Sequence, residues 1–330
     1  MIQRRLFVQA LAGSAALCAL HPLAALAAEA LNQVKIFYGF PAGSAGDSVA
    51  RRVGDKLGGS AFTKNAAVVD NRPGAGGRIA LEALKTSPAD GSVLAVCQAS
   101  ALSTYPHIYS KLNYGIADFA PISIGAVMTH GLAVGPMVPA SVKTLKDYIA
   151  WAKANPKEAS YGSPGAGSTP HFLGALLGLN SGTDLKHIPY RGSLPAVNDV
   201  VGGQIASSMT PAGDYLPFAK AGKLRVLATS GNTRAPYLPD VPTFAEQGFP
   251  EIVAEEWFGF IAPAKTPPDV IKAANAAITA ALKDPAIVEG LFSVGLVAQG
   301  STPEEMKKSI QSEYERWGPL VKKIGFTAES

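Results

Sequence analysis

Short apolar segments alternate with longer amphipathic segments along most of this chain, and this alternation limits the fold more than any single motif. The apolar segments predict buried strands at residues 34–40, 93–96, 122–127, 131–134, 224–229 and 257–261. The segments between them predict helices at residues 47–57, 79–86, 145–154, 171–179, 195–202, 268–283 and 303–322. Strands that alternate with helices of this length favour parallel sheets with helices on both faces. The sequence therefore predicts an α/β fold.

The first 27 residues have the composition of an export signal. Arg4 and Arg5 precede a run rich in Ala and Leu, which ends at Ala25-Leu26-Ala27, a small-x-small cleavage pattern. No second long apolar stretch follows, so residues 1–27 predict a signal peptide rather than a membrane span. The paired arginines are compatible with export by either the Sec or the Tat route, and both stay open.

Cysteine content and charge exclude several classes of protein. Cys18 lies in the predicted signal peptide after a bulky leucine, so we expect no lipid anchor there. Cys97 is then the single cysteine of the mature chain and cannot form an internal disulfide. The formal net charge is only +4, and Lys and Arg are scattered, so there is no electrostatic case for nucleic-acid binding. The remaining length, about 300 residues, suffices for two cores of ordinary domain size.

Three glycine-containing loops, at residues 40–47, 161–170 and 190–195, each connect a predicted strand to a predicted helix. Glycines let the backbone turn sharply, and a helix N-terminus offers unpaired N–H groups with a partial positive charge. We expect Thr169 to cap the second helix and Ser193 the third. One such loop alone only caps its helix, but three on one sheet predict a shared site for a carboxylate or phosphate.

No arrangement typical of an enzyme is present in the sequence. The glycine loops do not match a nucleotide-binding motif, no G-x-S-x-G elbow occurs, and the histidines lack metal-ligand spacing. Cys97 follows an apolar strand, which favours a buried, inert thiol. Glu255 and Glu256 are adjacent in an extended segment and point to opposite faces, so we expect one solvated and one structural carboxylate. We predict a non-enzymatic protein without cofactor or metal.

Ten short motifs are similar to those of a known family. They include Asn71-Arg72-Pro73-Gly74-Ala75-Gly76-Gly77 and Leu238-Pro239-Asp240-Val241-Pro242-Thr243, together with residues 39–47, 88–91, 118–122, 163–171, 187–192, 202–204, 222–225 and 257–259. Their order and spacing resemble the Bug family, the substrate-binding proteins of tripartite tricarboxylate transporters. The resemblance covers essentially the whole chain after the predicted signal peptide.

The resemblance implies a type II periplasmic-binding-protein fold (a Venus flytrap), with two lobes of parallel or mixed sheets flanked by helices. It places lobe 1 at residues 28–126 plus 229–330 and lobe 2 at residues 127–228. It also implies a periplasmic monomer that captures a small carboxylate, aliphatic or aromatic and most simply a dicarboxylate, for the membrane subunits of the transporter. The ligand-binding residues carried over from the family are Gly43, Ser44, Ala45, Gly46, Gln98, Ala99, Ser100, Ser163, Gly165, Gly167, Ser168, Thr169 and His171.

Three positions leave alternatives open. The family's first loop usually reads Gly-Gly-Gly-Thr before Asp, whereas this chain has Gly43-Ser44-Ala45-Gly46 before Asp47, which predicts a differently shaped pocket. Arg191 stands where lysine is frequent, and it either forks onto a second carboxylate of the ligand or pairs with a surface carboxylate. His171 either contacts the ligand or bonds locally in the first turn of its helix. Two other functions also stay open, a sensory receptor that feeds a signalling partner and an enzyme acting on a small organic acid.

Overall fold

The computed structural model describes residues 29–328, and those from Leu31 onward form one compact unit. The predicted signal peptide and Cys18 lie outside the described residues. Within the described part, no helix has both the length and the apolar character needed to cross a bilayer.

Strands and helices alternate as the sequence predicts. The strands are β1 (Lys35–Tyr38), β2 (Val68–Asn71), β3 (Val93–Gln98), β4 (Phe119–Val134), β5 (Ser160–Ser163), β6 (Lys186–Pro189), β7 (Ser207–Pro211), β8 (Arg225–Thr229), β9 (Glu255–Pro263) and β10 (Val297–Ala298). The α-helices are α2 (Ala45–Lys56), α3 (Arg78–Lys85), α4 (Ala99–Ser103), α5 (Tyr105–Ile108), α6 (Leu145–Ala154), α7 (Thr169–Ser181), α8 (Ser193–Val201), α9 (Leu216–Lys220), α10 (Pro268–Ala281), α11 (Pro285–Phe292) and α12 (Pro303–Ile324). Short 3-10 turns are η1 (Ala75–Gly77), η2 (Ile116–Asp118), η3 (Ala212–Tyr215) and η4 (Ala245–Gln247).

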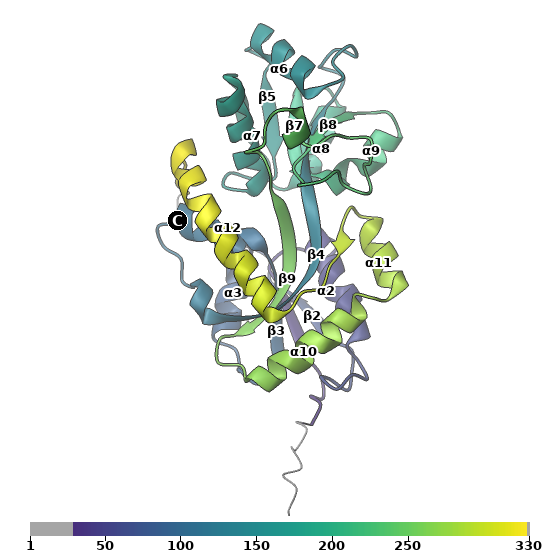
Figure 1. Ribbon diagram of the computed structural model, residues 1–330, viewed down its shortest axis with the longest axis vertical. Helices are drawn as coiled ribbons and strands as arrows, with labels where there is room; N and C mark the ends of the chain where they lie inside the picture. The colour runs from purple at the N-terminus through teal and green to yellow at the C-terminus, as the bar shows by residue number, and fades with distance from the viewer. Residues whose placement is uncertain (1–28, 329–330) are drawn as a thin grey trace, which may run out of the picture. The chain divides into compact units, whose positions relative to one another are not determined.

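The strands form two groups that share β4. The first group contains β1, β2, β3, β9 and β10, and the second contains β5, β6, β7 and β8. The strand order is β2-β1-β3-β9-β4-β7-β5-β6, and β8 and β10 also pair with β4. β1 is parallel to β2 and β3, and β5 is parallel to β6 and β7, whereas every pairing of β4 or β9 is antiparallel. β4 pairs with β9 over residues 119–129 and with β7 over residues 130–134, so it passes from one group to the other (Figure 1). The α/β prediction is confirmed, and the sheets are mixed.

The prediction of two separate strands at 122–127 and 131–134 was wrong. One continuous strand, β4, covers both, and Gly131 pairs with Thr210 of β7 and Thr229 of β8. The Gly131 carbonyl also accepts a hydrogen bond from the Tyr215 hydroxyl at 3.0 Å. Gly131 is therefore a strand residue that lets a tyrosine ring approach, with its nearest carbon 3.2 Å from the position that a Cβ would take.

The central strand β7 was not predicted because its residues are polar. Ser207 and Ser208 are fully buried between β4 and β5. The Ser207 hydroxyl lies 2.8 Å from that of Tyr148, and the Ser208 hydroxyl lies 3.1 Å from that of Tyr215. Buried hydroxyl groups that pair with one another cost little on burial, so a serine-rich strand can occupy the middle of a sheet.

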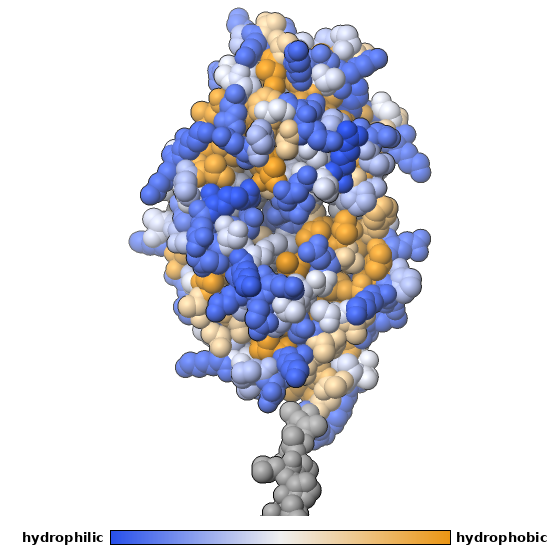
Figure 2. Space-filling view, in the orientation of Figure 1, coloured by the Kyte–Doolittle hydropathy of each residue, from blue (hydrophilic) through white to orange (hydrophobic). Residues whose placement is uncertain are grey.

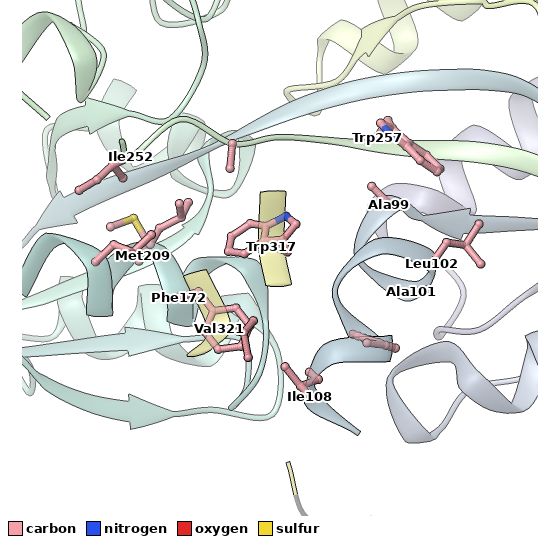
Figure 3. Packing of buried hydrophobic residues seen from close by; sticks show 14 of the residues in the cluster. Ala99, Ala101, Leu102, Ile108, Phe172, Met209, Ile252, Trp257, Trp317 and Val321 are labelled. Atoms are coloured by element: carbon pink, nitrogen blue, oxygen red, sulfur yellow. The ribbon is translucent and has the colours of Figure 1, made fainter. Parts of the chain in front are cut away.

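Helix α12 packs along one face of the molecule and connects the segments that carry the predicted ligand loops. It buries Met306, Ile310, Trp317 and Val321 and packs against α4, α5, α7 and β4. Figure 3 shows Trp317 and Val321 between Phe172 of α7 and the α4–α5 segment. A second core cluster lies where α2, α10 and α11 cover the first group of strands. The starts of α4 and α7 are thus held by a common neighbour.

Candidate functional site

The first glycine loop, between β1 and α2, is closed by bonds within the chain. Ser44 is at the N-cap position of α2, but its hydroxyl donates to the Pro41 carbonyl at 2.7 Å instead of capping the helix. A Cβ at Gly46 would lie 2.5 Å from the Tyr38 hydroxyl oxygen, so only glycine fits there. The backbone N–H of Gly43 donates to Asp47 Oδ2 at 2.8 Å.

Asp47 acts as an internal anion for this loop. Its carboxylate is 2% exposed and accepts hydrogen bonds from Gly43, from Arg51 Nε at 2.9 Å and from Asn71 Nδ2 at 2.8 Å. Burial alone would raise the pKa of Asp47, but the bonds from Arg51, Gly43 and Asn71 lower it below its ordinary value. One of the donors assigned to the ligand is therefore already used by the protein.

The residues that follow β3 also form hydrogen bonds within the protein. The Gln98 amide donates to the Gly76 carbonyl at 3.2 Å and to the Tyr105 hydroxyl at 3.3 Å. The backbone N–H of Ser100, in α4, donates to Glu256 Oε1 at 3.2 Å. A second carboxylate of the protein thus occupies a predicted donor.

The second glycine loop, between β5 and α7, is held by its own hydroxyl groups. The Ser163 hydroxyl donates to the Gly165 carbonyl at 3.0 Å and lies 2.7 Å from His187 Nε2. Ser168, not Thr169, caps α7, because its Oγ accepts the backbone N–H of His171 at 3.4 Å. The cap lies one residue earlier because Thr169 already has helical geometry as the first residue of α7.

His171 makes the local bond that the sequence left as one of two possibilities. Its Nδ1 accepts the backbone N–H of Gly167 at 3.1 Å, and its ring stacks on that of His187 with centroids 3.9 Å apart. Burial lowers the pKa of His171 to about 3 and that of His187 to about 4, so both rings are neutral near pH 7.

The third glycine loop precedes α8. Gly192 holds the N-cap position in place of Ser193, so the helix begins one residue earlier than the sequence predicts, and the Ser193 side chain interacts with Asp214 of η3. Arg191 is exposed and forms no ion pair with any residue of the described chain. Pairing of Arg191 with a surface carboxylate is therefore not observed.

Two of the predicted loops meet at one small cavity. Ala99 and Ser100 of α4 line it together with Thr169 of α7. The rest of its wall consists of Ser103, Ala254, Glu255, Glu256, Glu313 and Trp317. The cavity measures about 10 Å³, which suffices for one water molecule at most. The other predicted ligand residues do not line it.

Residues 49–326 match the family described as "Tripartite tricarboxylate transporter family receptor". The chain belongs to this family. It is 34% identical to protein BugT of Bordetella pertussis over 88% of this chain and 89% of that relative. The solved structure described as a periplasmic transporter is 35% identical with a TM-score of 0.80, over 90% of this chain and 98% of that one. An adipate-bound protein from R. palustris is 29% identical, also with a TM-score of 0.80 and the same coverage.

Membership of the transporter receptor family identifies the chain as a binding protein of the periplasmic-binding-protein fold and not as an enzyme. The expectation from the sequence motifs is confirmed at this level. The family receptors of known structure share the mixed α/β architecture described above.

A larger cavity of about 620 Å³ lies between α12 and the strands β4 and β9 of the receptor. Its walls include Val127, Trp257, Glu255, Glu313 and Arg316, and none of the predicted ligand residues. Figure 2 shows that hydrophilic side chains dominate the face on which α12 lies, whereas hydrophobic ones gather over α11 and β10.

The sequence analysis assigned no role to His130 and Asp214 of the receptor, which lie in a series of contacts that begins at Glu256 of the small cavity. Glu256 lines this cavity and is 6% exposed. Glu255 is less buried and accepts the backbone N–H of Asn232 at 3.2 Å. The expectation of one structural and one more solvated carboxylate is therefore confirmed. His130 of β4 approaches Glu256, and Asp214 of η3 lies near His130. The sequence offered one signal for this group: a histidine, His130, and a glutamate, Glu256, each stand inside an otherwise apolar strand sequence.

Proposed function

We propose that this protein is a periplasmic receptor that captures a small organic acid between two lobes and delivers it to the membrane subunits of a tripartite tricarboxylate transporter. The observation that carries the proposal is the meeting of Ser100 and Thr169 at one cavity, because each belongs to a loop that the family resemblance assigned to the ligand. The adipate-bound relative supports a carboxylic acid as the ligand. Export through the predicted signal peptide, by Sec or Tat, is part of the proposal.

Two backbone donors remain for the carboxylate. The N–H groups of Ala45 and Thr169, the first residues of α2 and α7, make no hydrogen bond within residues 29–328. Both helices are long enough to present a partial positive charge at this end. Such donors hold a carboxylate with a modest net gain per bond, about 0.5–1.5 kcal/mol, which suits a ligand that must be released.

Strand pairing supports two lobes in the proposal. The sequence predicts a division into residues 28–126 plus 229–330 and residues 127–228, and we propose to move its second boundary. Because β8, which ends at Thr229, pairs with the same part of β4 as β7 does, we place the second crossing between lobes at the start of β9, near Glu255. An acid that touches both α2 and α7 binds the closed arrangement better than the open one and so drives closure, which small-angle scattering detects as a fall in radius of gyration.

The test is calorimetric titration of the mature protein with adipate, followed by other mono-, di- and tricarboxylates. Ser44→Ala removes the hydroxyl that holds the first loop to the Pro41 carbonyl, and Thr169→Ala removes a hydroxyl at the small cavity. Each change should weaken binding by about 0.5–2 kcal/mol, the range for a lost hydrogen bond. Thr86→Ala, at an exposed threonine at the end of α3, is the matched control and should change nothing. Binding of no organic acid, or full binding by both loop variants, would contradict the proposal.

A further inference from the structure

The segment that follows α12, residues 325–328, contacts both predicted lobes, and we call it the tail segment. Gly325 ends α12 in the left-handed conformation, with a φ of 73°, and so turns the chain out of the helix. The backbone N–H of Ala328 donates to the Ile108 carbonyl at 2.8 Å, and Ala328 forms a parallel bridge with Tyr109. Because Ile108 and Tyr109 belong to predicted lobe 1, this end of the tail segment is bonded to lobe 1.

Phe326, two residues before Ala328, contacts the other predicted lobe. The centroid of its ring lies 5.1 Å from that of His171 and 5.5 Å from that of Phe172, with interplanar angles of 78° and 70°. Edge-to-face pairs at such distances are favourable aromatic contacts. His171 and Phe172 lie in the first turn of α7, in predicted lobe 2. The tail segment is therefore bonded to one lobe and packed on the other.

The tail segment also reaches the second glycine loop at Gly167. A Cβ on Gly167 would lie 3.1 Å from Ile108 Cδ1 and 3.2 Å from Phe326 Cε1. A side chain of lobe 1 and a side chain of the tail segment thus meet the loop at the same residue. The backbone N–H of Gly167 is in turn the donor to His171 Nδ1. Phe326 consequently acts on the position of this loop both directly, at Gly167, and through the His171 ring.

We propose that the tail segment is a clasp that links the two lobes in the arrangement that brings the ligand loops together, and that Phe326 is a positioning residue for the second loop. The inference rests on the proposed function, which places the ligand between the lobes. Opening of the lobes would separate Ile108 from His171, so it has to break either the hydrogen bond of Ala328 or the aromatic contacts of Phe326. The clasp thus favours the closed form without touching the ligand, and it raises the apparent affinity by raising the closed fraction.

The test removes the contact at each end of the clasp in turn. Phe326→Ala removes the ring that packs on lobe 2, and Ala328→Pro removes the N–H that bonds to lobe 1. Because a link is lost when either end is released, each variant should enlarge the radius of gyration of the unliganded protein in small-angle scattering. For the same reason the double variant should enlarge it no further. Thr327→Ala, at the exposed residue between the two, is the matched control and should change nothing.

Binding of adipate provides a second measurement. In calorimetric titration, Phe326→Ala and Ala328→Pro should each bind adipate about twofold to tenfold more weakly than the wild type, the factor that corresponds to an aromatic contact. Phe326→Tyr keeps the ring and should bind adipate as the wild type does. Circular dichroism checks that each variant is folded. If Phe326→Ala fails to fold, Ala328→Pro decides the question, because it leaves every aromatic ring in place.

The outcomes separate this inference from the proposed function. An unchanged radius of gyration in both single variants would overturn the clasp. Additive effects of the two changes would also overturn it, because they would show two independent packing contacts in place of one link. Larger radii in both variants, together with binding of no organic acid by any form of the protein, would support the clasp and contradict the proposed function.

Discussion

The backbone N–H of Gly167 donates a hydrogen bond to Nδ1 of His171, at 3.1 Å. Because this nitrogen accepts, the proton of the neutral ring lies on Nε2. The second glycine loop is therefore held by an imidazole in one tautomer, stacked on the ring of His187. A loop fixed in this way presents the first turn of α7 in a defined position.

Acid should loosen this loop. Burial lowers the pKa values of His171 and His187 to about 3 and 4, from an ordinary value of 6.5. The stability that the neutral rings provide is fully present above pH 6.5 and is lost as pH falls through about 4 to 3. His171→Asn keeps an acceptor without a titrating ring, so it should melt lower at pH 8 but lose less Tm between pH 8 and pH 4. Equal losses in both proteins, measured by circular dichroism, would contradict this.

When it is ionised, the buried Asp214 carboxylate should lower the free energy of unfolding of the unliganded receptor. Burial raises the pKa of Asp214 to about 6 from 3.8, so the stability due to its neutral form is present below pH 3.8 and is lost as pH rises through about 6. Asp214→Asn should therefore raise the free energy of unfolding at pH 8, by up to about 3 kcal/mol, and leave it unchanged near pH 3.5. Urea denaturation at the two pH values measures the difference. A gain of equal size at both would show that the charge is not the cause.

Helix boundaries were predicted well where local chemistry marks them. Helix α6 was predicted with its observed bounds, and the Thr144 capping box explains why, since Thr144 and Asp147 bond each other's backbone N–H groups. Helices α10 and α12 begin at the predicted prolines, Pro268 and Pro303. In these cases the signal is complete within one turn of the chain.

Which donors of the predicted site are bonded within the protein could not be predicted, because those bonds come from distant residues. The sequence located the glycine loops correctly, but it could not show that Glu256 bonds Ser100, since the two are separated by most of the second group of strands. Strand β7 was missed for the same reason, because its Ser207 is stabilised by a distant residue, Tyr148 of α6. Local patterns reveal donors, whereas only the assembled chain reveals which donors are already used.

Removal of the Asp47 carboxylate should destabilise the first loop strongly. Asp47→Ala leaves the N–H of Gly43, the Arg51 guanidinium and the Asn71 amide without their acceptor. Because the Arg51 side chain is 46% exposed, the expected loss is that of unpaired hydrogen-bonding groups, about 1–3 kcal/mol, and not that of a fully buried charge pair. Chemical denaturation should show this loss, with Asp55→Ala, at an exposed position of the same helix, changing stability by less than about 0.5 kcal/mol.

Cys97 should be unreactive in the folded protein. It is a free, buried thiol, and burial raises its pKa to about 12, so almost no thiolate exists at neutral pH. A disulfide reagent such as DTNB should label no thiol in the native mature chain and one thiol after denaturation. Rapid labelling of the native protein would mean that β3 opens locally.

β9 is the last long strand along the chain, and its late position in the sequence limits the order in which this protein can fold. β3 lies between β1 and β9, so one edge of its apolar strand has no partner from the time residues 93–98 exist until residues 255–263 follow. All of β5 to β8 is made in the interval. Contacts between segments so far apart slow folding, and an open apolar edge invites pairing with other chains. A chain that stops before Glu255 can build its second group of strands, yet it leaves the first with an exposed edge, which makes that edge the place where aggregation starts.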